Sequence, residues 1–169
     1  LGCHKQALLI SRGVGDRSLE IDALNEIAYS CVSLGENQRA LAYGTDALRL
    51  SREVRNLRGE ARALNNIGEA HYAFGDFQKS LESFEEALCF WQALKDPRGQ
   101  AQALINTGYV YTDVGELQRS LDLYRRALAL FRAGRDGTGE ARVLVAVGFV
   151  QRSLGEKTEA LGSLKEALQ

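Results

Sequence analysis

A fixed spacing of 40 residues runs through the whole chain and constrains its fold more than any other feature. Residues of one kind recur at this spacing in several columns: Leu24, Leu64, Leu104 and Leu144; Gly35, Gly75, Gly115 and Gly155; Leu41, Leu81, Leu121 and Leu161; Ala47, Ala87, Ala127 and Ala167; Asp16, Asn56, Asp96 and Asp136. A constant period of this length is typical of proteins built from stacked structural repeats, in which each unit packs against its neighbours.

Each period predicts two amphipathic helices joined by a short turn. In the central unit, apolar residues at helical spacing favour a first helix over residues 58–73 and a second over residues 77–94. Gly75 suits the left-handed turn that ends a helix, and Asp76 then places negative charge where the dipole of the next helix favours it. Asn56 and its column are suitable N-caps, and Pro97 follows Asp96 where the start of a helix tolerates proline.

Small residues recur where two helices must approach closely. One column of small residues lies in the first helices, and large residues lie at a common position of the second helices: Ala28, Gly68, Gly108 and Gly148 for the first, and Phe84, Tyr124 and Leu164 for the second. Small residues opposite large ones allow antiparallel helices to interdigitate at the density of a protein interior.

These residues resemble the signature of the tetratricopeptide repeat. The central unit carries Leu64, Ile67, Gly68, Gly75, Ser80, Phe84 and Ala87, and the next carries Leu104, Gly108, Tyr111, Gly115, Ser120, Tyr124 and Ala127. His71 and Thr107 depart from the tyrosine and the leucine of that signature. The usual repeat is about 34 residues long. The longer spacing is similar to a branch that includes G-protein-signalling modulators, kinesin light chain and bacterial arrays that precede a CHAT protease.

The resemblance implies an all-α fold: a right-handed solenoid of antiparallel helix pairs. Residues 1–12 align with residues 41–52, so we expect a second helix without its first at the start, followed by four repeats. We expect a single array over residues 1–169, with units at about 1–15, 16–55, 56–95, 96–135 and 136–169. The last second helix carries Leu161, Leu164 and Leu168, which predicts an apolar side that a further helix or another chain covers.

Composition excludes several classes of function. The net charge of −1 gives no reason to expect binding to nucleic acid or to an anionic membrane. No continuous apolar run is long enough to span a membrane, and no signal peptide is evident. Three separated cysteines favour a reducing compartment, so we expect a cytoplasmic protein. The chain lacks methionine and opens at Leu1, which predicts a fragment of a longer protein.

No cluster of residues predicts catalysis, a metal or a cofactor. His4 and His71 lie in different units, and the cysteines lack the spacing that zinc requires. The glycine-rich stretch at residues 134–139 lacks the lysine of a phosphate-binding loop, so we interpret it as a flexible linker between helices. We therefore expect no enzyme activity and no cofactor.

The one functional surface that the resemblance implies is the concave face of the superhelix, which the first helices line and where a peptide usually lies. The candidate contacts, read by repeat phase, are Asn25, Tyr29, Arg62, Asn65, Asn66, Glu69, Gln102, Asn106, Tyr109, Arg142 and Phe149. Asn66 and Asn106 resemble the asparagine that often contacts bound peptide in related long-repeat arrays.

Each residue type in this set offers a different contact. Asparagine both donates and accepts hydrogen bonds, arginine can form a fork onto a carboxylate, and aromatic rings are rigid apolar anchors. The alternative is that the asparagines pair with a neighbouring helix and that the aromatic rings fill gaps between repeats.

The early part of the face carries Asp22, Glu26 and Glu69, and the late part carries Arg142, Phe149 and Arg152. A ligand with a basic end and an acidic or apolar end would match, and charge reversal at Arg62 and Arg142 should weaken binding of an acidic peptide.

The leading functional prediction is a protein-interaction scaffold that binds a peptide or a helical segment in the concave groove. The first alternative is a regulatory or sensor segment of a larger bacterial signalling protein or protease. The second is a self-assembly module that associates through uncovered end helices. The expected partner in every case is a protein or peptide.

Overall fold

The computed structural model describes residues 2–168, and within them it contains nine α-helices and no strand. In chain order these are α1 (Gly2–Val14), α2 (Arg17–Ser33), α3 (Asn37–Val54), α4 (Leu57–Ala73), α5 (Phe77–Ala93), α6 (Pro97–Asp113), α7 (Leu117–Ala133), α8 (Gly137–Ser153) and α9 (Lys157–Glu166). The helices form two compact units, Leu1–Leu94 and Lys95–Gln169, which are described separately. The division falls one residue from the expected boundary between the repeats at 56–95 and 96–135.

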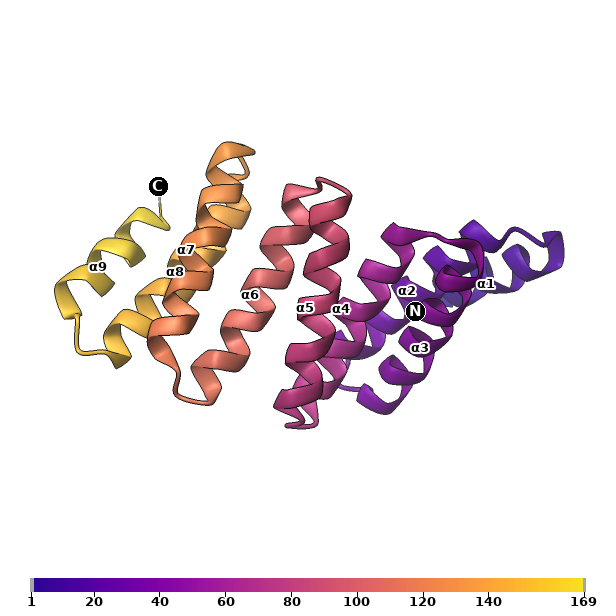
Figure 1. The fold of residues 1–169 in the computed structure, drawn as a ribbon, viewed down its shortest axis with the longest axis horizontal. Coiled ribbons are helices and arrows are strands. Elements are labelled where there is room, and N and C mark those ends of the chain that lie inside the picture. Colours follow the sequence, from indigo (N-terminus) through magenta and orange to yellow (C-terminus); the bar gives the residue numbers. More distant parts are fainter. Residues whose placement is uncertain (1, 169) are drawn as a thin grey trace. The chain divides into compact units, whose positions relative to one another are not determined.

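Each unit is built from antiparallel helix pairs (Figure 1). In the first unit α2 packs on α3 and α4 packs on α5, with α1 against α2; in the second unit α6 packs on α7 and α8 packs on α9. The predicted bounds of α4 and α5 are confirmed to within one residue, and so is the leading helix without a partner of its own repeat. The all-α prediction is therefore confirmed, as is the arrangement in helical hairpins.

The helix caps follow the predicted columns. The side chains of Asp16, Asn56, Asp96 and Asp136 each accept a hydrogen bond from a backbone N–H in the first turn of the next helix. At the other end, Gly35 has a φ of 72°, and the N–H of Glu36 donates to the carbonyl of Cys31 at 2.8 Å. Such a left-handed residue, with the hydrogen bond that closes the helix end, turns the chain sharply into the second helix.

One expectation about a linker is wrong in part. The glycine-rich stretch at residues 134–139 is not all linker, because α8 begins at Gly137. A Cβ atom at Gly139 would lie 2.4 Å from the ring of Phe131, so this position needs glycine for close packing rather than for flexibility. Gly139, in the first turn of α8, therefore marks a close contact with α7.

The pairing of small with large residues holds in three hairpins. A Cβ atom at Gly68 would lie 2.5 Å from the ring of Phe84, and one at Gly108 would lie 2.4 Å from the ring of Tyr124. Gly148 has the same relation to Leu164, at 2.8 Å. The first hairpin differs, because Ala28 is its small residue and Gly44 stands where the other hairpins have a large side chain.

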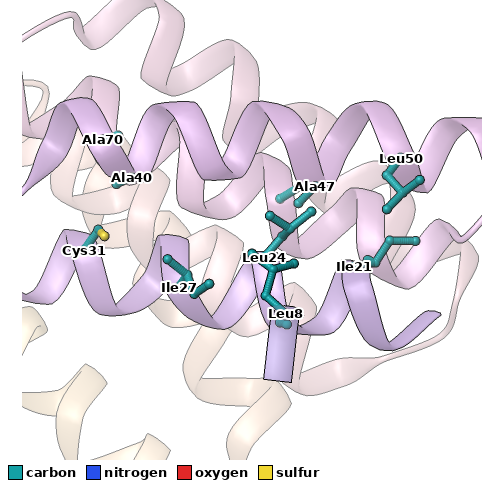
Figure 2. Packing of buried hydrophobic residues seen from close by; sticks show 11 residues of the cluster. Leu8, Ile21, Leu24, Ile27, Cys31, Ala40, Ala47, Leu50 and Ala70 are labelled. Carbon is teal, nitrogen blue, oxygen red and sulfur yellow. The ribbon is translucent and has the colours of Figure 1, made fainter. Parts of the chain in front are cut away.

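The core of the first unit is an apolar layer between its first and second helices. Figure 2 shows Ile21, Leu24 and Ile27 of α2 beside Ala40, Ala47 and Leu50 of α3, and all of them are buried. Leu8 of α1 and Ala70 of α4 extend the same cluster. Because every hairpin repeats this apolar layer, burial of apolar surface between neighbouring helices is the main stabilising term.

A recurring ion pair joins the end of each of three second helices to the start of the next first helix. Arg12 Nε lies 2.8 Å from Glu20 Oε1, and Arg132 Nε lies 2.7 Å from Glu140 Oε1. Arg52 and Glu60, at the equivalent positions, are more loosely paired, with Arg52 Nε 3.7 Å from Glu60 Oε2. The Glu20 side chain is buried, and the hydrogen bond from Arg12 holds the pKa of its carboxyl below the ordinary value.

Replacement of Gly108 by alanine tests the close approach of α6 and α7. The added methyl group would overlap the Tyr124 ring, so we expect Gly108→Ala to lower the free energy of unfolding by about 1–3 kcal/mol. Gly162→Ala in α9 is the matched control, because no atom lies within 4 Å of its Cβ position. The control should be neutral or stabilising by up to about 1 kcal/mol. Urea denaturation of both variants measures this, and equal effects would contradict the packing argument.

The buried carboxylate predicts a pH-dependent effect of Glu20→Gln. A lowered folded-state pKa stabilises the protein above the ordinary pKa of the carboxyl, 4.5, and this stabilisation is lost as the pH falls. We expect Glu20→Gln to lower the free energy of unfolding by about 1–2 kcal/mol at neutral pH. This loss should shrink progressively as the pH falls below 4.5. Glu53→Gln, which breaks the exposed pair with Arg49, should cost less than about 0.5 kcal/mol. A cost for Glu20→Gln that is constant with pH in urea titrations would refute the argument.

Candidate functional site

One repeat phase of the first helices carries exposed aromatic side chains in three of the four repeats, while the positions on either side of it are largely buried. It carries Tyr29, Glu69, Tyr109 and Phe149. The three aromatic side chains are 56%, 38% and 51% exposed. Exposed aromatic side chains that recur on one face are frequent anchors of protein interfaces, so this phase is a candidate contact surface of each unit.

The asparagines of the first unit are buried and bond to protein. Asn25 is fully buried, and its Nδ2 donates to the carbonyl of Gly59 at 3.3 Å. Asn66 donates from its Nδ2 to the carbonyl of Asn25 at 3.0 Å and lies 3.3 Å from Asn25 Oδ1. These amides join α2 to α4. Since Asn25 exposes no surface, it offers nothing to a ligand in this arrangement, and we leave it out of the contacts proposed below.

Asn65 is the third buried amide of this face. Its Oδ1 atom has no hydrogen-bond partner among residues 2–168, and the side chain is nearly covered. Glu69, one turn further along α4, is half-buried and exposes more of its surface than Asn65. At this phase the first unit therefore exposes mainly Tyr29, with Glu69 half-buried.

Arg62 already holds two carboxylates of its own chain. Its Nη1 lies 3.1 Å from Asp22 Oδ1, and its Nη2 lies 2.5 Å from Glu26 Oε1. The guanidinium links α4 to α2, as the asparagines do. The fork that the sequence predicts for Arg62 thus exists within the chain, and both of its partners come from the preceding repeat.

In the second unit, amides replace those carboxylates. Arg142 Nη2 donates to Gln102 Oε1 at 2.8 Å, and Gln102 Nε2 donates to Asn106 Oδ1 at 2.7 Å. Tyr109 packs edge-on against Tyr124 with ring centroids 5.8 Å apart, and Arg152 lies over the Phe149 ring at 5.1 Å. The result is a face with aromatic rings and arginines.

Residues 2–168 contain no group of three or more His, Cys, Asp or Glu side chains placed to hold a metal ion. None of their helices is both long enough and apolar enough to cross a membrane. His71 lies 3.9 Å from Asp76 in the turn between α4 and α5, and buried Thr107 donates to the carbonyl of Ala103 at 2.9 Å. Both departures from the repeat signature are thus accommodated locally.

Comparison with protein families agrees with the geometry. The model of the tetratricopeptide repeat matches residues 19–93, 59–133 and 99–169. The chain belongs to the tetratricopeptide repeat family. A comparison with curated protein sequences finds no match.

Solved structures share the tetratricopeptide fold at low sequence identity. BtubC (BKLC) from P. vanneervenii has 21% identity and a TM-score of 0.82, over 97% of this chain and 68% of that one. A Rap protein complexed with competence and sporulation factor has 16% identity and a TM-score of 0.89, over 98% of this chain and 47% of that one. A STAND protein with a tetratricopeptide repeat sensor from Pyrococcus horikoshii has 15% identity and a TM-score of 0.77, over 90% of this chain and 24% of that one. The chain therefore spans less than half the length of two of these three proteins.

Sequence reasoning missed the ion pairs that organise this face and the helix junctions. The Arg62 cluster was detectable because Asp22 precedes Arg62 by one full repeat, which places the two on neighbouring first helices. The junction pairs also have a signal, since Arg12, Arg52 and Arg132 each precede a glutamate by eight residues. Neither spacing distinguishes a bonded pair from two solvated charges, so the contacts needed the structure.

The buried amide of Asn25 predicts a structural cost on truncation. Asn25→Ala removes a donor to Gly59 and an acceptor from Asn66, so we expect the free energy of unfolding of the array to fall by about 1–3 kcal/mol. Gln78→Ala, which removes an exposed bond to Glu82, should change it by less than about 0.5 kcal/mol. Thermal and urea unfolding of the two variants measure the difference. If Asn25→Ala left the free energy of unfolding unchanged, the amides of Asn25 and Asn66 would not be what holds α2 to α4.

Proposed function

We propose that this chain is a protein-interaction scaffold that binds a peptide or helical segment of a partner protein on the exposed face of its first helices. The observation that carries the proposal is the repeat phase within the first helices at which Tyr29, Tyr109 and Phe149 are exposed. Aromatic side chains lose little conformational entropy on binding and bury a large area, which makes them frequent anchors of protein interfaces. We propose no enzyme activity and no cofactor for the chain itself.

The proposed contacts divide between the two units. In the first unit they are Tyr29, Asn65, Asn66 and Glu69, with the buried asparagines acting mainly as supports. Arg62 is left out of the contacts, because its guanidinium already holds Asp22 and Glu26. In the second unit they are Gln102, Asn106, Tyr109, Arg142 and Phe149. A Rap protein of the same fold is known in complex with competence and sporulation factor, which supports a ligand-binding role for such an array.

A second candidate function is a sensor segment within a larger regulatory protein. The STAND protein from Pyrococcus horikoshii carries a tetratricopeptide repeat sensor, and this chain matches 24% of its length. We propose this role as compatible with the first, because a sensor must also bind a ligand. A reducing, cytoplasmic location is part of both proposals, since Cys3, Cys31 and Cys89 are free thiols.

Self-assembly is a third proposal and rests on apolar side chains of α9. Leu161 is exposed there, and Leu168 follows the helix with most of its surface in solvent. Association through these side chains would make the oligomeric state depend on concentration. Sedimentation over a range of concentrations tests it, and a monomer throughout would count against it.

The scaffold proposal predicts that binding depends on the aromatic phase and not on exposed apolar surface in general. The wild-type array is used to select binders from a phage library of random peptides, and affinities of the selected peptides are then measured by calorimetry. A Tyr29→Ala, Tyr109→Ala, Phe149→Ala variant should lose at least about ten-fold in affinity, since anchor residues contribute roughly 1–2 kcal/mol or more each.

The matched control carries the same type of change on another face. Leu34, Val114 and Leu154 end their first helices and are also exposed, so a Leu34→Ala, Val114→Ala, Leu154→Ala variant removes similar apolar surface. Circular dichroism checks that both variants keep their helices. Equal losses of affinity in the two variants would remove the aromatic phase as the binding surface.

A further inference from the structure

Two arginines at the same repeat position have opposite electrostatic surroundings. Arg62 of α4 is paired with Asp22 and Glu26, so one positive and two negative charges leave that cluster net negative. Arg142 of α8 stands 80 residues later, where Gln102 and Asn106 occupy the positions of the two acids. Amides satisfy the hydrogen bonds of a guanidinium but do not neutralise its charge. The charge of Arg62 is therefore offset by two neighbouring carboxylates, whereas the charge of Arg142 is bonded only to an amide.

A second arginine of α8 is also left without an acidic partner. Arg152 lies over the Phe149 ring, 5.1 Å from its centroid. Within residues 2–168, no Asp or Glu oxygen lies within the ion-pair distance of 4.0 Å from Arg142 or Arg152. The pKa of Asp136 is lowered mainly by hydrogen bonds to its carboxylate from the Gly139 N–H and from Arg98. The charge of Arg142 makes a smaller contribution to this lowering.

The two arginines flank apolar surface on one face of α8. Arg142, Val145, Phe149 and Arg152 follow one another at spacings of three, four and three residues, which is the spacing of one helix face. All four side chains are exposed. Arg142 and Arg152 are ten positions apart, which corresponds to roughly 15 Å along the helix axis. We call these four residues the α8 strip: a cation at each end and apolar side chains between them.

We propose that the α8 strip binds an acidic segment of a partner protein in which two carboxylates flank an apolar side chain. The proposal rests on the scaffold function above and assigns the chemistry of its ligand. The apolar residue of the ligand would lie against Val145 and Phe149, and each carboxylate would accept hydrogen bonds from one guanidinium. In an extended peptide, roughly 15 Å corresponds to four or five residues between the carboxylates.

The charge near Arg62 in the first unit does not favour an acidic ligand, so the proposed preference for carboxylates is confined to the α8 strip. The Arg62 cluster repels carboxylates, because its net charge is negative and both acids are partly exposed. An acidic ligand should therefore depend on Arg142 and be nearly indifferent to Arg62, although the two arginines occupy equivalent positions. This asymmetry is what the experiment measures.

The peptides selected from the random phage library on the wild-type array are the probes. We expect them to contain two acidic residues on either side of an apolar one, and replacement of those acids by the corresponding amides should weaken binding at least about ten-fold. Arg142→Gln and Arg152→Gln should each weaken binding about three- to ten-fold, with a reduced salt dependence. Arg62→Gln is the matched control and should change affinity less than about two-fold.

Other outcomes separate this inference from the scaffold proposal. If the selected peptides are neutral or basic, or if Arg62→Gln weakens binding as much as Arg142→Gln, the acidic ligand is wrong while the scaffold role stands. If no selected peptide loses affinity in the Tyr29→Ala, Tyr109→Ala, Phe149→Ala variant, the scaffold role on this face is wrong and the acidic ligand falls with it.

Discussion

The contact between a large side chain of a second helix and a glycine of its first helix sets the geometry of three of the four hairpins. At Gly68, Gly108 and Gly148, even one added methyl group would overlap the facing side chain. Helices that approach this closely bury their apolar faces against each other, so the opposite side of each first helix is left free. We propose the phase of Tyr29, Tyr109 and Phe149 as the binding face, because these side chains stay exposed beside the packed layer.

The same repeat also separates residues that hold the array together from residues that are available to a ligand. Asn25 and Asn66 use their amides to join α2 to α4, and Arg62 uses its charge in the same way. In the second unit, buried Ile105 takes the position of Asn25, and the amides of Gln102 and Asn106 take the positions of the acids beside Arg62. One backbone scaffold thus supports two different surfaces, and a few substitutions at fixed phases decide which surface a unit presents.

Much of the fold could be predicted from the sequence because it depends on local chemistry. The bounds of α4 and α5, the caps at Asp16, Asn56, Asp96 and Asp136, and the opposition of Gly108 to Tyr124 all follow from spacing and from the conformations that each residue type allows. The glycine-rich stretch at residues 134–139 was the exception. Composition indicated flexibility, whereas Gly139 is glycine because the Phe131 ring leaves no room for a side chain.

The sequence by itself therefore determined the repeat, the hairpins and the face of the first helices on which we propose that a ligand binds, since a helix presents its residues at a fixed spacing. Only the tertiary structure decided which candidates on that face are accessible and which charges are already paired. Asn25 and Tyr29 stand one turn apart on α2, yet one is fully buried and the other is 56% exposed. Arg62 and Arg142 share a phase, yet of these two only Arg62 forms an ion pair with carboxylates among residues 2–168. Those differences depend on the neighbouring helix, which the spacing along one helix does not contain.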